Sequence, residues 1–107
     1  MAKVEQLGGG WIAEEAVAVA LYSVLATSDF EEAVILAVNH SGDSDSTGAI
    51  AGNLAGALYG IDAIPNRWLD ALELRNEIIV IADDLLGLRE GTIDPEDDET
   101  WDRYPGR

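Results

Sequence analysis

Two aspartates one residue apart, Asp43 and Asp45, stand among hydroxyl side chains in the segment GDSDST. Carboxylate and hydroxyl oxygens are the hard ligands that Mg²⁺ prefers in proteins. Positions i and i+2 do not share a face of a helix, so both carboxylates reach one centre only if Asp43 lies outside the first helical turn. The preceding Ser41 and Gly42 permit such a bend. The spacing is therefore compatible with a partial magnesium site made of both aspartates and a neighbouring hydroxyl.

The same residues leave three other interpretations open. As an EF-hand loop, residues 43–50 fit the early positions, but Leu54 stands where a bidentate glutamate is needed. A phosphotransfer aspartate would come directly from a hydrophobic strand, whereas residues 39–42 intervene here. As a helix N-cap, Asp43 or Asp45 would need no ligand, because aspartate is a preferred residue at that position. Taken alone, the two acids favour the N-cap interpretation.

Glycine recurs at every fourth position directly after the aspartates, at Gly48, Gly52, Gly56 and Gly60. Positions four apart lie on one face of a helix, so these residues predict a bare stripe along a helix over about residues 45–59. Gly60 is expected to end that helix. The three interior glycines cost about 3 kcal/mol of helix propensity relative to alanine. We therefore expect another part of a protein core to approach this face closely.

Apolar residues at helical spacing predict further helices on both sides of the glycine helix. We expect them over residues 11–26, 30–38, 66–74 and 77–86. The β-branched content of residues 34–38 leaves a strand possible there. Capping-box spacing between Asp29 and Glu32 instead favours a helix that starts near residue 30. The pattern predicts an all-α protein of four to five helices.

The two ends of the chain differ in composition from its middle. We expect a flexible glycine-rich lead over residues 1–10, a helical domain with the aspartate motif over residues 11–87, and an acidic tail over residues 88–107. Gly87 is expected to end the last helix. The tail is predicted either to be disordered or to pack through Trp101 and Tyr104. The pair Asp83-Asp84 is interpreted as solvated acids.

The composition limits the class of function. The 107 residues carry 21 acids and 6 bases, a net charge of −15, which disfavours nucleic-acid binding because phosphates need clustered lysine and arginine. There is no cysteine, so disulfides and thiolate metal sites are excluded. The N-terminus has no apolar segment of a signal peptide, and no apolar run is long enough to span a membrane. We therefore expect a cytoplasmic protein without membrane contact.

Residues 42–46 followed by the glycine helix resemble the C-terminal metal motif of the ADP-ribosylglycohydrolase family. The segment Gly8-Gly9-Gly10-Trp11 and the helix after it are similar to a glycine-rich turn and helix of the same family. Residues 64–69 are similar to the family segment that follows its glycine helix. The resemblance covers about residues 7–86.

This resemblance implies an irregular, orthogonal helical bundle with a cleft that holds two Mg²⁺ ions. Family members hydrolyse the glycosidic bond between ADP-ribose and a protein side chain or a small molecule. By position in the motif, Asp43, Asp45 and Ser46 would be the metal ligands. Gly10 and Trp11 would border the site for ADP-ribose. From residue type alone, Trp11 is instead predicted to be a core side chain. His40 is predicted to form hydrogen bonds in its loop or to the residues behind the ligands, and not to act as ligand or catalyst.

The family motifs Gly-Asp-x-x-Gly and Thr-Asp-Asp-Thr, which carry further metal ligands in N-terminal elements, do not occur in this sequence. The acid/base carboxylate of family members also lies in these N-terminal elements, so no catalytic residue is assigned in this chain. We expect a C-terminal portion that is inactive alone and is completed by an N-terminal chain. The alternative is a non-catalytic helical interaction module that retains a relic metal motif. In either case, uncovered apolar faces predict a homo-oligomer or a complementary partner chain.

Overall fold

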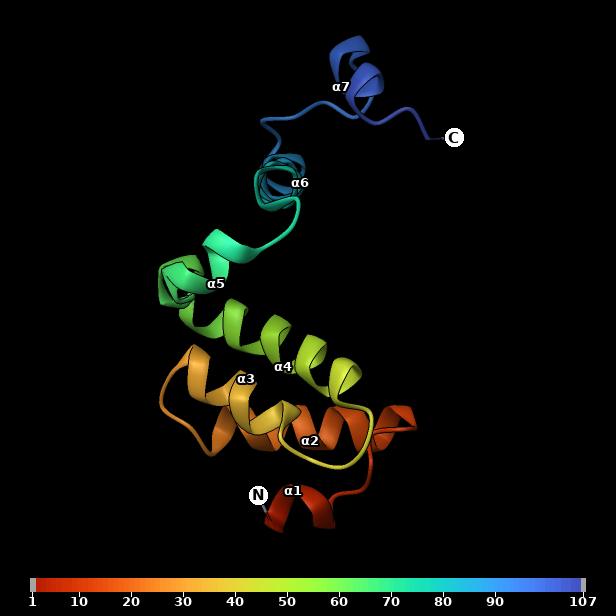
Figure 1. Cartoon of the computed structure of the whole chain (residues 1–107). Coiled ribbons are helices and arrows are strands. Elements are labelled where there is room, and N and C mark those ends of the chain that lie inside the picture. Colours follow the sequence, from red (N-terminus) through yellow and green to blue (C-terminus); the bar gives the residue numbers. More distant parts are fainter. Residues whose placement is uncertain (1, 107) are drawn as a thin grey trace. The chain divides into compact units, whose positions relative to one another are not determined.

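The computed structural model describes residues 2–106, and its regular structure is entirely helical within that range. The elements are α1 (Ala2–Gln6), α2 (Ala13–Leu25), α3 (Phe30–Val38), α4 (Ser44–Tyr59), the 3-10 helix η1 (Ile61–Ala63), α5 (Asn66–Ala71), α6 (Arg75–Glu90) and α7 (Asp98–Arg103) (Figure 1). The all-α prediction is confirmed. There are more helices than predicted, because short helices also form in the expected lead and tail.

Local sequence signals explain where the central helices start and end. Asp29 caps α3 by accepting a hydrogen bond from the backbone N–H of Glu32 at 2.8 Å. The helix runs through Val38, so the alternative strand over residues 34–38 is excluded. Gly60 ends α4 with a φ of 79°, a left-handed value that glycine adopts without strain. Helix α4 thus begins one residue before the predicted start and ends where predicted.

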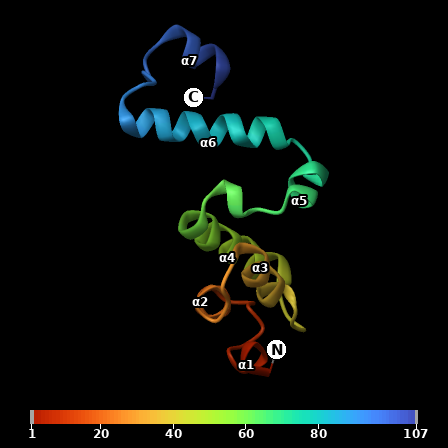
Figure 2. The ribbon, with the colours of Figure 1, turned by 90° about the vertical axis from the view of Figure 1, so that its left-hand side faces the viewer.

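The chain separates into two compact units, residues 1–68 and 69–107. In the first unit, α2, α3 and α4 pack against one another, and α1 packs on α2 (Figures 1 and 2). The central core consists mostly of alanine, with Val24 and Phe30 as the larger members. Small core side chains allow the helix backbones to approach closely. The expected lead contains α1, whose Val4 is completely buried.

In the second unit, α6 and α7 are the main elements. Helix α6 does not end at Gly87, as predicted, but continues to Glu90 and is ended by Gly91. Gly87 is instead the buried residue of α6, since Thr92 and Ile93 fold back over it. The Gly87 carbonyl accepts the Thr92 backbone N–H at 2.9 Å. Gly87 therefore makes room for the returning chain. None of the helices described is both long and apolar enough to cross a lipid bilayer.

Candidate metal centre

The three predicted metal ligands lie together at the start of α4. Asp43 is the N-cap of this helix, and its Oδ2 accepts a hydrogen bond from Ser46 Oγ at 2.8 Å. Asp43 Oδ1 and Asp45 Oδ1 accept from the backbone N–H of Ser46 at 3.5 and 3.1 Å. Both carboxylates thus converge on one residue. The N-cap interpretation is correct for Asp43, and it is compatible with a metal role because each carboxylate retains unused lone pairs.

Electrostatics also tie the two aspartates together. A hydrogen bond with the Asp45 carboxyl, followed in size by one from the Ser46 hydroxyl, lowers the pKa of Asp43 below its ordinary value. A carboxyl group whose pKa is lowered is ionised at neutral pH, and the ionised form is the one that binds a cation. The set of donors, two carboxylates and a hydroxyl, is the hard-oxygen chemistry that suits Mg²⁺. The residues therefore fit part of a magnesium site.

This set of ligands is incomplete. Mg²⁺ takes near-octahedral coordination, so three side-chain oxygens leave further positions to water or to other ligands. Across residues 2–106, no group of three or more histidine, aspartate or glutamate side chains is placed to hold a metal ion. Asp43, Asp45 and Ser46 therefore form a candidate half-site, with too few oxygens to hold Mg²⁺ by themselves.

Two of the alternative interpretations do not agree with the backbone. An EF-hand loop would run without helix through about twelve residues from Asp43. Helix α4 instead begins at Ser44 and continues to Tyr59. A phosphotransfer aspartate would directly follow a strand. The Asp43 loop, which consists of residues 39–43, instead follows helix α3.

The glycine turn, residues 8–10, packs directly on the Asp43 loop. The carbonyl oxygen of Gly9 accepts the backbone N–H of Asp43 at 2.7 Å. A Cβ atom added to Gly42 would lie 1.9 Å from that same oxygen, so only glycine fits there. Gly10 has a φ of 75°, and its N–H donates to Glu15 Oε2 at 3.1 Å. The turn is therefore built to bring two backbones into contact beside the aspartates.

The two predicted substrate residues lie beside this contact but differ in exposure. Gly10 is buried, and a Cβ added to it would meet Thr47 Cγ2 at 2.8 Å and the Asp43 carbonyl oxygen at 3.5 Å. Trp11 is 71% exposed, so its prediction as a core side chain is wrong. The glycine turn leaves the core at this point and directs the indole outward. The indole lies against Gly9 of the glycine turn, and its exposed surface is available to a ligand.

His40 forms hydrogen bonds, as predicted, one within the loop and one to helix α4. Its Nδ1 accepts the backbone N–H of Gly42 at 3.0 Å, and its Nε2 lies 2.8 Å from Thr47 Oγ1. Glu5 was not predicted to contribute. Its carboxylate accepts both the backbone N–H and the hydroxyl of Ser41, at 3.0 and 2.9 Å. Nothing in the local sequence signals this contact, because the two residues are far apart in the chain.

The buried face of α4 is not the glycine stripe. The buried residues are Thr47, Ala51 and Ala55, one position before the glycines. A Cβ added to Gly48 would lie 2.6 Å from Val38 Cγ1, whereas one added to Gly52 would meet nothing within 4 Å. Within the described residues, α3 thus approaches the stripe closely at Gly48, whereas no atom approaches it at Gly52. Helix α4 thus has two adjacent stripes of small residues with the same spacing, the glycines and the residues that precede them. Packing against α2 and α3 buries the second stripe.

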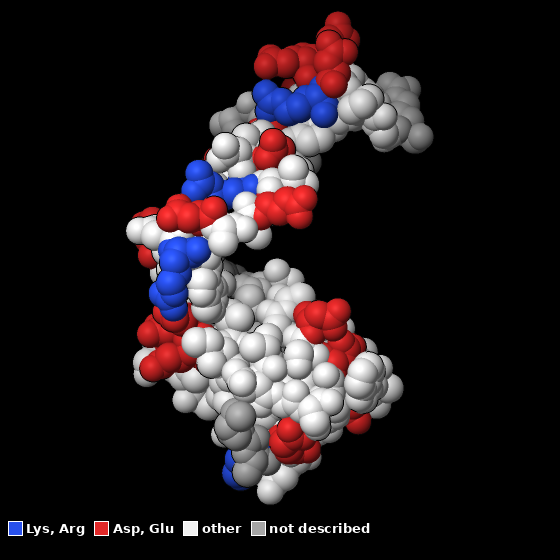
Figure 3. Space-filling view, viewed as in Figure 1, with Lys and Arg blue, Asp and Glu red and all other residues white. Residues whose placement is uncertain are grey.

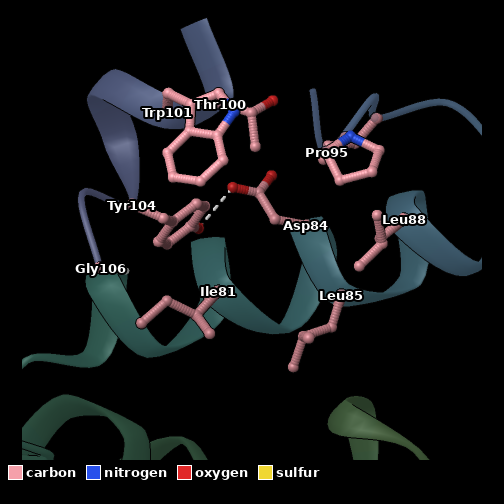
Figure 4. A pocket seen from close by; sticks show the side chains of 10 residues that line it. Ile81, Asp84, Leu85, Leu88, Pro95, Thr100, Trp101, Tyr104 and Gly106 are labelled. Atoms are coloured by element: carbon pink, nitrogen blue, oxygen red, sulfur yellow. Dashed lines mark hydrogen bonds between the residues drawn. The ribbon is translucent and has the colours of Figure 1, made fainter. Parts of the chain in front are cut away.

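A separate cavity of about 300 Å³ lies in the second unit, between α6 and the segment that contains α7 (Figure 4). Its walls are mostly apolar and include both predicted tail residues, Trp101 and Tyr104. At its edge, Asp84 accepts hydrogen bonds from the Tyr104 hydroxyl at 2.6 Å and from Arg103 at 2.5 Å. The prediction of Asp84 as a merely solvated acid is therefore wrong. The cavity holds no arrangement of ligands like that of the Asp43 loop.

Comparisons with known proteins agree with the resemblance in the motif. The model of the ADP-ribosylglycohydrolase family matches residues 1–95. An ADP-ribosyl-dinitrogen reductase glycohydrolase of Rhodospirillum rubrum is 47% identical over 57 residues, which are 53% of this chain and 19% of that protein. An uncharacterized protein of Archaeoglobus fulgidus is 45% identical over 85 residues, 79% of this chain and 27% of the relative.

A more distant relative is an ADP-ribosylhydrolase of Homo sapiens, 31% identical over 93 residues, 77% of this chain and 26% of that protein. No solved structure matches the chain. The chain spans about a fifth to a quarter of the length of these relatives. The match of the family model to most of the chain, together with these relatives, establishes that the chain belongs to the ADP-ribosylglycohydrolase family.

Proposed function

We propose that this chain supplies the C-terminal part of a magnesium-dependent ADP-ribosylglycohydrolase site. One observation carries the proposal: Asp43, Asp45 and Ser46 converge at the start of α4, directly beside the glycine turn. Membership of the family makes hydrolysis of a glycosidic bond to ADP-ribose the activity to test. The substrate class is an ADP-ribosylated protein or an ADP-ribosyl small molecule.

Each residue of the half-site has a defined part in this proposal. Asp43, Asp45 and Ser46 would hold Mg²⁺ through their side-chain oxygens. When bound, the ion would act as a Lewis acid that polarises ribose hydroxyls and an attacking water. The exposed indole of Trp11 offers a flat apolar surface on which an adenine ring can stack. The buried Gly10 lets the glycine turn pack closely on α4 beside Asp43, since a Cβ there would lie 2.8 Å from Thr47 Cγ2.

The remaining ligands and the acid/base group would come from a complementary N-terminal chain. Exposed apolar side chains support such a partner, since a surface of this kind is a feature of interfaces. In the first unit they include Trp11, Ile12, Leu21, Leu25, Leu54 and Leu58. The face of this unit visible in Figure 3 is largely uncharged, with acidic side chains toward its edges.

The second candidate function is a non-catalytic helical interaction module in which the metal motif is a relic. The same exposed apolar side chains favour it, together with a half-site that has only two carboxylates. In this case the chain associates with itself and has no need of Mg²⁺. The two candidates therefore differ in whether metal binding and association depend on each other.

Titration of Mg²⁺ into the purified chain, followed by calorimetry, tests the half-site. We expect saturable binding to the natural chain and none to the double variant Asp43→Asn with Asp45→Asn. The control is Asp62→Asn with Asp83→Asn, which removes the same charge from two exposed aspartates that do not belong to the loop. Equal binding by all three proteins would show that the heat comes from the diffuse acidic surface and would overturn the metal assignment.

Light scattering with and without Mg²⁺ separates the two candidate functions. Association of the chain with itself that is the same in the natural protein and in the double variant favours the interaction module. Cleavage of ADP-ribosylarginine that requires both this chain and an N-terminal chain of a family member supports the hydrolase. Activity of this chain alone would contradict the claim that its site is incomplete.

A further inference from the structure

Three consecutive backbone N–H groups of the Asp43 loop are each bonded to a different partner. The Ser41 N–H donates to Glu5 Oε1 of α1 at 3.0 Å, and the Asp43 N–H donates to Gly9 O of the glycine turn at 2.7 Å. Between them, the Gly42 N–H donates to His40 Nδ1 at 3.0 Å. The orientation of every peptide unit leading to Asp43 is therefore fixed by a hydrogen bond.

The hydrogen bonds of His40 define its tautomer. Because Nδ1 accepts from Gly42, the ring proton lies on Nε2 and is donated to Thr47 Oγ1 at 2.8 Å. Thr47 in turn donates its own proton to the carbonyl of Ala37 at 2.7 Å. Thr47 is completely buried, so its position is set by the packing of α4 against α3.

The His40 ring thus joins two parts of the half-site that belong to different local structures. Asp43 stands at the end of the loop, while Asp45 and Ser46 lie in the first turn of α4. The ring fixes the loop through Gly42 and the first turn of α4 through Thr47. We propose that His40 and Thr47 are positioning residues that set the distance between Asp43 and the two helical ligands; this inference rests on the proposed metal site.

Substitutions at Thr47 separate positioning from simple packing. Thr47→Val keeps the volume but loses the hydroxyl, whereas Thr47→Ser keeps the hydroxyl. Loss of groups that orient metal ligands typically weakens metal binding by about 10- to 100-fold. We expect the affinity for Mn²⁺, measured by electron paramagnetic resonance, to fall about 10-fold in Thr47→Val and to be close to natural in Thr47→Ser.

Two substitutions of His40 divide its two hydrogen bonds. Asparagine places an oxygen near the position of Nδ1 and keeps only the bond to Gly42, whereas glutamine places an amide nitrogen near Nε2 and keeps only the bond to Thr47. We expect both variants to bind Mn²⁺ more weakly than the natural chain, and His40→Ala to bind it most weakly. Ser23→Ala is the matched control, because this hydroxyl is as completely buried as that of Thr47 but bonds to Val19 within α2.

Hydrogen exchange of the Gly42 and Asp43 amides provides a readout that needs no metal. We expect faster exchange at both amides in His40→Ala, with unchanged exchange in α2. If the natural chain binds Mn²⁺ and His40→Ala binds it equally well, the positioning role is wrong. If the natural chain binds no Mn²⁺, the proposed half-site fails, and unchanged exchange at Gly42 then also overturns the role of His40 in holding the loop.

Discussion

The Asp43 loop of the first unit and the α6–α7 cavity of the second unit are held by opposite kinds of contact. In the loop, consecutive backbone amides are bonded to partners from three segments, and glycine lies on glycine without intervening side chains. At the cavity, apolar side chains form the walls, and one surface cluster, Asp84 with Arg103 and Tyr104, joins the two helices. The contacts of the loop fix the positions of individual backbone atoms. The contacts at the cavity mainly hold two apolar surfaces together.

The difference follows from what each contact can tolerate. Where two backbones touch, no side chain can change its rotamer to make room for an added atom. A substitution there therefore either leaves the loop geometry intact or disrupts it. Exposed ion pairs are screened by water and contribute little, so the Asp84 cluster can be altered without loss of the unit. The family match includes the loop and α6 but ends at residue 95, before α7 begins at Asp98.

The largest effect is expected from a methyl group placed between the two backbones. In Gly42→Ala the added carbon would lie 1.9 Å from the Gly9 carbonyl oxygen, so the glycine turn must move away and Asp43 loses its bond to Gly9. We expect the free energy of unfolding to fall by about 3 kcal/mol, the upper end for overpacking. Urea unfolding followed by circular dichroism measures this change. A fall below about 0.5 kcal/mol, typical of an ordinary surface site, would contradict a backbone contact.

A smaller effect should separate two glycines of the same stripe. Gly52→Ala adds a carbon with no neighbour within 4 Å, and we expect about 1 kcal/mol of stabilisation from helix propensity. Gly48→Ala gains the same propensity but places its carbon 2.6 Å from Val38 Cγ1. We expect Gly48→Ala to be less stable than Gly52→Ala by about 1–2 kcal/mol. Thermal unfolding of the pair measures the difference, and equal stabilities would show that α3 does not approach the stripe.

The smallest effect is expected at the Asp84 cluster, where it should appear as a dependence on pH. The Tyr104 hydroxyl and Arg103 lower the pKa of Asp84 from 3.8, so this bond is complete above that value and is lost as pH falls through the folded pKa. The Asp84 carboxylate raises the pKa of Tyr104 from 10.0, so the bond is complete below that value and is lost as pH rises through the folded pKa.

We therefore expect the docking of α7 on α6 to be constant between about pH 5 and 9 and to weaken at both extremes. The NMR signal of the Trp101 indole N–H reports this change. Asp84→Asn should remove the weakening in acid, and Tyr104→Phe the weakening in base. A titration of Trp101 that is the same in both variants and the natural chain would show that the cluster does not hold α7.

Much of the candidate site could be predicted because its signals are local. Aspartate is a preferred N-cap, and the glycines after Asp43 recur at the spacing of a helix. The start and end of α4 therefore follow from residues close together in the chain. The hydrogen-bonding role of His40 also followed from its place in the loop. Trp11 was predicted incorrectly, because residue type alone does not show that the glycine turn directs its side chain outward.

By itself, the sequence determined helices α2 to α6, the family and the place of the aspartate motif at the start of a helix, since each depends on residue types at short, fixed spacing. Only the tertiary structure decided which stripe of α4 is buried and that α6 continues past Gly87. It also decided that Gly9 and Glu5 hold the loop around Asp43. The physical reason is the same in each case. Each of these features depends on a contact with another segment, either a neighbouring helix or a chain that folds back, and the periodicity within one segment does not specify that contact.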